Sequence, residues 1–497
     1  MMDRAARPSS RRALALALSV ALIQPGVPAA DPYRLPDLGS SADTALSSLE
    51  QRELSRAFMR SVRKALSFDS DPLLNDYLHT LGQRLVAASG ASDGFVFFLI
   101  NEPAANAFAG PGGHIGVFTG LILATTAESE LAAVLAHEIA HVKQKHLLRM
   151  FESQRRQALP TVALLIAAAL LGARVEGQVG AAAMAGVQAA AAQSRLNFTR
   201  DHEEEADRIG IEILAQAGYD PYALPGFFEN LGKSTRFEER SAPELLRTHP
   251  VTAGRIADGL ARAERYGHRQ QADALGFHLT RAALRERGYA RAPAAVEHFR
   301  ATLTQGRYRH ETAERYGLAL ALTRDGRLEA AAQEADRLLA AAPRQVEFVV
   351  LRARIEQRAG ALEAALRRLR EARAPAPDNW PLTVALAETL LAAQRPEEAL
   401  RALEQFNRLR PEIDAVYELM ADTAARAGQR VQAHWYRGEA LYRLGDLESA
   451  IRQLELALRQ PHVPFPLAAR VETRLAAWRD EERASKPLRA RFGSQQP

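Results

Sequence analysis

The central element of the first half of the chain is Leu131-Ala-Ala-Val-Leu-Ala-His137-Glu138-Ile-Ala-His141-Val142. It contains no glycine or proline, and its apolar residues predict a helix that lies in a hydrophobic core. Residues four apart share one face of a helix, so His137 and His141 can bind one zinc ion while Glu138 lies beside them. A glutamate buried beside two histidines needs a partner such as a metal ion to offset desolvation. The pattern therefore predicts a metallopeptidase site, against the plainer alternative of polar residues on a solvated face.

Composition limits which site is possible. The chain has 497 residues, 47% of them hydrophobic, which is enough for two or three domains with cores of their own. It contains no cysteine, so disulfides, thiolate ligands and a lipid-modified cysteine are excluded. Any metal ion must therefore be held by histidine and carboxylate side chains.

The amino terminus is typical of a signal peptide. Four arginines before position 13 precede the apolar run Ala13 to Ile23, and Val27-Pro28-Ala29 offers small residues for cleavage after Ala29. We therefore expect residues 1–29 to be removed on export by general secretion. Their removal takes the net charge from +5 to +2, because they carry four arginines and one aspartate (5 − 3). A basic surface for nucleic acid is not indicated.

Between the leader and the motif helix, the sequence predicts two helices and two strands. The helices fill residues 43–89, and the strands are Phe95–Ile100 and His114–Thr119, separated by a segment rich in turn formers. An edge strand beside a zinc site can pair with an extended peptide, whereas the plainer interpretation is an ordinary hairpin. The candidate substrate-binding residues are Gly113, His114, Ile115, Gly116 and Val117.

Past the motif helix lie two apolar segments, 162–171 and 181–192. Each is shorter than the roughly 20 residues that a membrane span needs. We expect a packed hairpin over the active site or a surface that touches the membrane, with core packing as the default.

A second polar cluster follows in Arg200-Asp-His-Glu203-Glu-Glu-Ala-Asp207. Glu203 and Asp207 are four apart and share a helix face, so one can bind zinc while the other orients a ligand histidine. Glu204 and Glu205 then face elsewhere.

Four motifs together resemble the HtpX-type gluzincin peptidases over roughly residues 40 to 260. They are His137-Glu138-x-x-His141, Glu203-x-x-Ala206-Asp207, the loop Asn106-Ala-Phe-Ala-x-Pro-Gly-Gly113, and Thr248-His249-Pro250 followed by Arg255-Ile256. The metzincin pattern would need Gly and His where this chain has Gln144 and Leu147.

This resemblance implies an α+β zincin-type peptidase domain, mostly helical with a small sheet, in residues 30–265. It also implies one zinc ion held by His137, His141 and Glu203. In this interpretation Glu138 is the general base and Asp207 supports a ligand. His249 has two roles that stay open: it stabilises the oxyanion, or it occupies the open zinc position and keeps the enzyme off until the Ser241–Pro250 loop moves.

The second half of the chain repeats itself. Gly326, Gly360, Gln394 and Gly428 begin similar segments at intervals of 34 residues, and Pro343, Pro377 and Pro411 follow the same interval. This is the period of tetratricopeptide repeats, so we expect an all-α superhelix in residues 266–485 and a tail at 486–497. A further copy at Gly445 comes only 17 residues after Gly428, which leaves the register of the last unit open.

The pairing of domains behind a signal peptide resembles exported quality-control peptidases of Gram-negative bacteria. That resemblance implies a periplasmic enzyme, with peripheral membrane contact left open, that degrades unfolded or misassembled outer-membrane β-barrel proteins. Its repeats would bind these clients and the barrel-assembly machinery, and it could also assist their assembly as a chaperone. The alternative is a repeat-based chaperone or scaffold whose peptidase domain is latent.

Overall fold

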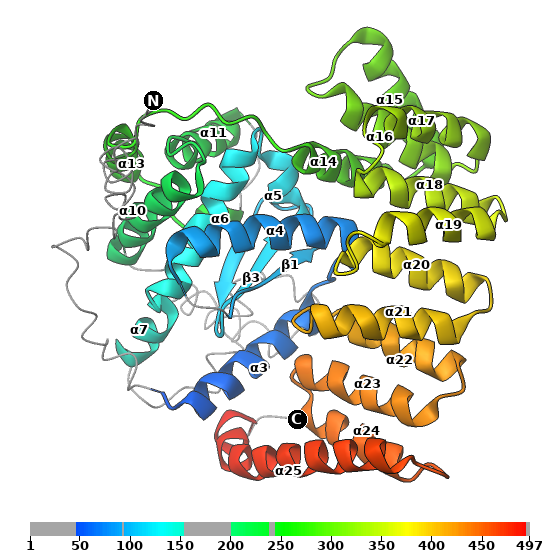
Figure 1. Cartoon of the computed structure of the whole chain (residues 1–497). Helices are drawn as coiled ribbons and strands as arrows, with labels where there is room; N and C mark the ends of the chain where they lie inside the picture. Colours follow the sequence, from blue (N-terminus) through cyan, green and yellow to red (C-terminus); the bar gives the residue numbers. More distant parts are fainter. Residues whose placement is uncertain (1–45, 92–93, 154–199, 238–243, 494–497) are drawn as a thin grey trace, which may run out of the picture. The chain divides into compact units, whose positions relative to one another are not determined.

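The computed structural model describes residues 46–91, 94–153, 200–237 and 244–493 (Figure 1). The expected signal peptide, the apolar segments between 162 and 192, and part of the 241–250 loop lie outside these ranges. Within them, no helix combines the length and the apolar character that a membrane crossing requires.

Within the described residues, two helices precede the sheet, as the sequence predicts. Helix α3 (Ser48–Ala65) begins with a capping box, in which Ser47 and Glu50 bond to each other's backbone N–H groups. Helix α4 (Pro72–Ser89) begins at the Asp71 cap with proline in its first turn, and Gly90 ends it at a φ of 64°. In both helices, capping residues in the local sequence set where the helix begins.

The sheet has three strands, β1 (Val96–Ile100), β2 (Ala107–Gly110) and β3 (His114–Phe118). Their order is β1-β3-β2, with β3 parallel to β1 and antiparallel to β2. The prediction that 114–119 is an edge strand is therefore wrong, because the segment interpreted as turns contains the third strand. Since β3 is paired on both sides, a peptide cannot be added to it. The substrate-strand prediction for Gly113, His114, Ile115, Gly116 and Val117 does not fit this sheet, and β2 lies at the edge instead.

The motif helix is α6 (Glu128–Lys143), and it follows the short helix α5 (Thr119–Ala124). It is buried on all sides from Leu131 to His141 and packs against α10 (Arg200–Ala217). Gly210 permits this close approach, because a Cβ there would lie 3.2 Å from the backbone nitrogen of His137. The glycine thus lets the two motif helices meet beside the histidines.

Further helices follow along the chain, and of these α7 and α11 pack against α6 and α13 packs against α10. Helix α7 (His146–Ser153) follows α6 after a left-handed residue, Lys145, with a φ of 53°. The others are α11 (Ala223–Phe237), α12 (Glu244–Thr248), α13 (Ala253–Glu264), α14 (Leu275–Arg287) and α15 (Ala292–Gln305). Helix α13 begins at the Thr252 cap.

The repeats are helix pairs, which confirms the period predicted from the sequence (Figure 1). Gly326, Gly360 and Gly428 turn the chain inside three pairs at φ of 79°, 79° and 73°, and Gln394 does so at 57°. Gly445 turns between α23 and α24, so α23 has a tight turn at both ends and the last copy comes half a period early. The helices are α16 (Glu311–Arg324), α17 (Leu328–Ala341), α18 (Val346–Arg358), α19 (Leu362–Arg373), α20 (Trp380–Ala392), α21 (Pro396–Leu409), α22 (Val416–Arg426), α23 (Arg430–Arg443), α24 (Leu447–Leu458) and α25 (Phe465–Gly493).

One hydrophobic cluster runs through the peptidase region into the first repeats. It includes Leu74 of α4, Leu135 of α6, Phe277 of α14 and Ile355 of α18. The domain boundary predicted near residue 265 stays a prediction, but the core continues across it.

Candidate active site

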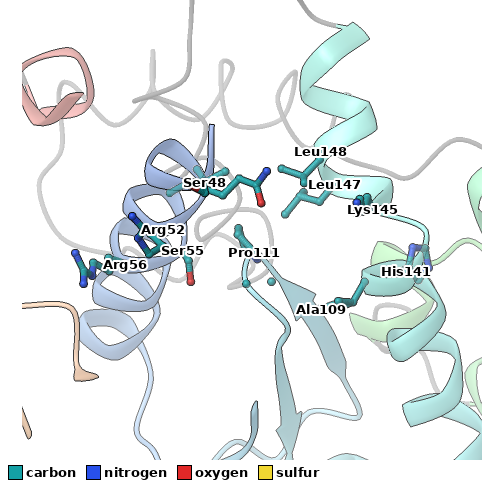
Figure 2. A pocket seen from close by; sticks show the side chains of 15 residues that line it. Ser48, Arg52, Ser55, Arg56, Ala109, Pro111, His141, Lys145, Leu147 and Leu148 are labelled. Carbon is teal, nitrogen blue, oxygen red and sulfur yellow. The ribbon is translucent and has the colours of Figure 1, made fainter. Parts of the chain in front are cut away.

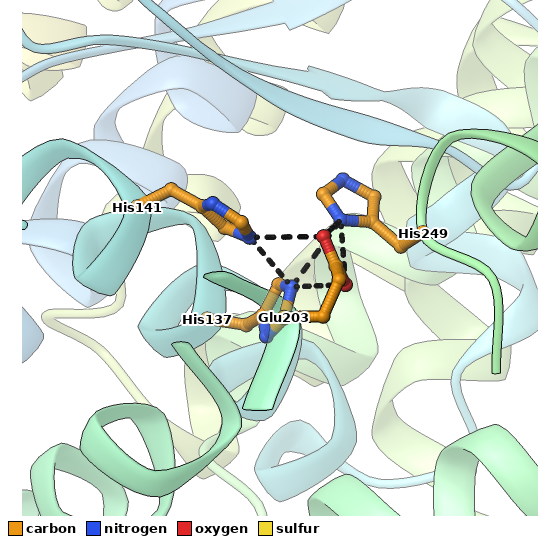
Figure 3. Close-up of side chains that lie close together, drawn as sticks. All are labelled: His137, His141, Glu203 and His249. Atoms are coloured by element: carbon orange, nitrogen blue, oxygen red, sulfur yellow. Dashed lines mark hydrogen bonds and ion pairs between the residues drawn. The ribbon is translucent and has the colours of Figure 1, made fainter. Parts of the chain in front are cut away.

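Helix α6 presents its two histidines to one point (Figure 3). His137 and His141 are each 2% exposed, and their Nε2 atoms lie 3.0 Å apart. Two ring nitrogens at this distance compete for one proton or share one cation. The spacing of four residues therefore produces the convergence that the sequence predicts.

Glu203 of α10 lies opposite these histidines. Its carboxylate oxygens lie 3.5 Å from Nε2 of both His137 and His141, and 3.0 Å from Nδ1 of His249. The side chain is 2% exposed, so its charge is offset by these neighbours and not by water. Glu203 is thus the carboxylate member of the cluster.

Asp207, one turn further along α10, supports the cluster from outside. Its Oδ1 lies 3.0 Å from Nδ1 of His137, the nitrogen that faces away from the other histidines. Arg255 of α13 donates from Nε and Nη2 to Asp207 at 2.7 and 2.8 Å, and its Nη1 lies 2.8 Å from Glu203. The buried guanidinium therefore fixes both carboxylates of α10 in one orientation.

His249 lies just after α12 and completes the group. Its Nδ1 is 3.3 Å from Nε2 of His137, and its Nε2 is 3.4 Å from Glu138. The segment that carries it is anchored at both ends: the N–H of Leu245 donates to the carbonyl of Ala105 beside β2, and Arg255 donates to the carbonyl of Pro250. We call His137, His141, Glu203 and His249 the metal-ligand cluster, because one ligand atom from each lies within 4.8 Å of the others.

The electrostatics of this cluster favour a cation. Burial alone would lower the pKa of His137, but Asp207 and Glu203 together raise it to about 10. Burial would raise the pKa of Glu203, yet His249 and His137 hold it well below its usual range. The pKa of His141 is lowered well below its usual value by burial and by His137. A positive charge on His137 is thus held beside an ionised carboxylate, and this donor set suits a divalent metal ion.

Glu138 lies beside the cluster without belonging to it. The carboxylate is fully buried, and neither oxygen has a hydrogen-bond partner among the described residues. Burial raises its pKa, although His249 and His137 partly offset this effect. A desolvated carboxylate with a raised pKa beside a metal site is suited to accept a proton.

A cavity of about 470 Å³ lies beside His141 (Figure 2). Helix α3 contributes Ser48, Arg52 and Ser55, strand β2 contributes Ala109, and the turn after it contributes Pro111. Leu147 and Leu148 of α7 complete a wall that combines apolar and basic side chains. The cavity joins the edge strand of the sheet to a member of the metal-ligand cluster.

The structure brings together all six residues for which the sequence predicts a zinc or catalytic role: His137, Glu138, His141, Glu203, Asp207 and His249. Sequence reasoning missed the role of Arg255, although it quoted the residue in a motif. It also gave no role to Asn106, whose buried side-chain amide has no hydrogen-bond partner among the described residues. The sequence carries a weak strand signal at this edge, the alternation Ala107-Phe108-Ala109, which could have identified it.

Comparison with known proteins agrees with this architecture. The profile of Peptidase family M48 matches residues 72–263, and a tetratricopeptide repeat profile matches residues 357–423. The chain is 33% identical over 454 residues to the "Beta-barrel assembly-enhancing protease" of Escherichia coli (strain K12), covering 91% of this chain and 93% of that one. The relative with the same name in Yersinia pestis is 32% identical over 442 residues, covering 89% and 90%.

A further relative matches over a shorter length. The "Mitochondrial metalloendopeptidase OMA1" of Schizosaccharomyces pombe is 33% identical over 182 residues, which cover 36% of this chain and 50% of that one. This relative therefore matches about a third of the chain, while the first two relatives match along about nine tenths of it. The chain belongs to the family of the beta-barrel assembly-enhancing proteases, metallopeptidases of family M48 that also carry tetratricopeptide repeats.

Proposed function

We propose that this protein is a periplasmic zinc endopeptidase that acts in the quality control and assembly of outer-membrane β-barrel proteins. The observation that carries the catalytic part is the convergence of His137, His141 and Glu203 beside the fully buried carboxylate of Glu138. The first two relatives, which match about nine tenths of this chain and whose name mentions β-barrel assembly, support the biological part.

His137, His141 and Glu203 would hold the zinc ion. When bound, zinc would polarise the scissile carbonyl and make an attacking water more acidic. Glu138 would accept the proton of that water and pass it to the leaving amine. Asp207, held by Arg255, would keep Nδ1 of His137 protonated so that Nε2 faces the metal.

The substrate would bind as an added strand on β2. The backbone of Ala109 faces Glu138, so a peptide paired with this strand would lie beside the general base. The amide of Asn106 would find its missing hydrogen bonds on the peptide backbone, since a buried amide without partners costs free energy. The cavity beside His141 would take a bulky apolar side chain of the client.

His249 would act as a plug of the metal site at rest. Its Nδ1 occupies the fourth place of the metal-ligand cluster, where a catalytic zinc site keeps an open position. The segment from Leu245 to His249 is also bonded to the carbonyl of Ala105, beside the strand that a substrate would join. We therefore expect His249→Ala to raise basal proteolysis, whereas a slower turnover would indicate the oxyanion role and an unchanged rate would contradict both.

The repeats would bind clients and the barrel-assembly machinery. Stacked helix pairs present an extended surface whose usual use is to hold a protein partner. The leader-like residues 1–29 support export to the periplasm. The rival function, a chaperone or scaffold with a latent peptidase, is favoured by the same His249 position.

Glu138→Gln in the full chain tests the enzyme assignment. Casein or an unfolded outer-membrane protein is offered to the wild type and to this variant. The same comparison is repeated in a second background, His249→Ala, in which the plug is absent. We expect Glu138→Gln to retain stoichiometric zinc and to lose turnover by about 100-fold or more. Equal proteolysis by both proteins would refute the role of Glu138, and no proteolysis in either background would support the scaffold.

A further inference from the structure

His146 begins α7 five residues after His141, a spacing that a single helix would not bring together. At about 100° per residue, side chains five apart differ by about 140° around a helix axis. Here α6 ends at Lys143, and Lys145 turns the chain at a φ of 53°. This left-handed residue returns His146 to the side of His141.

His146 is fully buried there and contacts two polar groups. Its Nδ1 lies 3.0 Å from Nδ1 of His141, and its Nε2 lies 3.1 Å from Oε2 of Glu205. The ring also stacks on His202 with centroids 4.4 Å apart. His146 therefore links a member of the metal-ligand cluster to a carboxylate that the cluster does not include.

Only one arrangement of protons suits this chain of contacts when His141 binds a metal ion through Nε2. The neutral ring of His141 then carries its proton on Nδ1 and donates it to Nδ1 of His146. His146 must carry its own proton on Nε2, which donates to Glu205. Arg149 donates to the same oxygen of Glu205 at 3.0 Å and holds the carboxylate in place.

We propose that His146, together with Glu205, is a positioning residue that orients the imidazole of His141 for metal binding. The inference rests on the proposed zinc site. The other ligand histidine is oriented by a carboxylate directly, since Asp207 lies 3.0 Å from Nδ1 of His137. His141 is instead oriented through an intervening imidazole, so the two ligands are supported by different means.

Two substitutions of similar size test the two ring nitrogens of His146 separately. In His146→Asn the side-chain oxygen can replace Nδ1 as the acceptor for His141, whereas in His146→Gln the amide can replace Nε2 as the donor to Glu205. Removing an outer partner of a metal ligand typically weakens metal binding 10- to 100-fold. We expect His146→Gln to raise the zinc dissociation constant by about that factor, and His146→Asn to stay within about threefold of the wild type.

The measurement is competition for zinc against a chromophoric chelator, using the full chain. The visible spectrum of the Co²⁺-loaded protein gives a second readout, which should change in His146→Gln and stay close to the wild type in His146→Asn. Thermal unfolding of the metal-free proteins checks the fold, and Glu204→Gln, at an exposed residue of the same helix as Glu205, is a control that should bind zinc like the wild type. A purely structural role would lower the metal-free melting temperature in both His146 variants and leave zinc affinity unchanged.

His146→Gln that binds zinc within twofold of the wild type, or His146→Asn that weakens binding as much as His146→Gln, would overturn this inference. Either result leaves the proposed zinc site intact. A wild-type protein that binds no zinc would instead refute the proposed function.

Discussion

Buried glutamates occur in both regions of the molecule, but they have different partners. In the repeats, Glu314 accepts two hydrogen bonds from Arg285 at 2.7 and 2.8 Å, and Glu439 accepts two from Arg474 at 2.9 and 3.0 Å. In the peptidase region, Glu203 faces three imidazoles besides one nitrogen of Arg255, and Glu138 has no hydrogen bond among the described residues. A carboxylate whose charged partners are guanidinium groups alone is a structural element, whereas a carboxylate that also shares imidazoles is suited to chemistry.

The largest effect should come from Glu203. Glu203→Gln keeps the shape of the side chain but removes a charged ligand, so zinc affinity should fall by more than about 100-fold, beyond the loss of an outer partner alone. Proteolysis should disappear with the metal. Elemental analysis of purified protein measures this, and Glu204→Gln should keep its zinc. Stoichiometric zinc in Glu203→Gln would mean that another residue supplies the carboxylate.

A glutamate-to-glutamine substitution at Glu314, in the repeats, should change stability alone. Glu314→Gln leaves Arg285 with a weaker partner, and we expect the free energy of unfolding to fall by about 1–3 kcal/mol. Chemical denaturation followed by circular dichroism measures the change. Zinc content should equal that of the wild type, and a loss of zinc here would erase the distinction between the two kinds of glutamate.

Zinc binding should release about one proton per site at pH 7. In the metal-free protein His137 has a pKa of about 10 and is protonated at pH 7, while Glu203 is ionised and His141 is neutral. A ligand imidazole must be neutral, so zinc affinity should rise about tenfold per pH unit between pH 6 and 8. Calorimetry in buffers of different ionisation enthalpy counts the protons. Release of none, or of two, would contradict this charge assignment.

The smallest effect concerns one turn of the repeats. Gln394 takes the place of the glycines at 326, 360 and 428, with a φ of 57° that costs a non-glycine residue about 1–2 kcal/mol. Gln394→Gly should therefore raise the free energy of unfolding by up to about 1 kcal/mol, after the greater freedom of glycine in the unfolded chain is subtracted. Gly360→Gln, the reverse change at the equivalent turn, should lower it. Thermal unfolding of both variants provides the comparison.

Local periodicity predicted much of this architecture. The four-residue spacings of His137 with His141 and of Glu203 with Asp207 assign a helix face directly, and the 34-residue repeat assigns the helix pairs. Strand β2 escaped prediction because four residues flanked by turn formers carry little alternation. Arg255 and His146 escaped for another reason: Asp207 lies 48 residues from Arg255, and His146 reaches His141 only through the left-handed turn at Lys145.

The hydrophobic cluster shared by α4, α6, α14 and α18 also bears on the order in which the protein can mature. All members of the metal-ligand cluster precede residue 250, yet the core around their helices includes Phe277 and Ile355. A chain that folds from its amino-terminal end has the ligand residues before it has the side chains that complete their core, and contacts of such long range form late. The site would therefore become rigid only after the first repeats have been made, so that a chain interrupted before them would lack a finished metal centre.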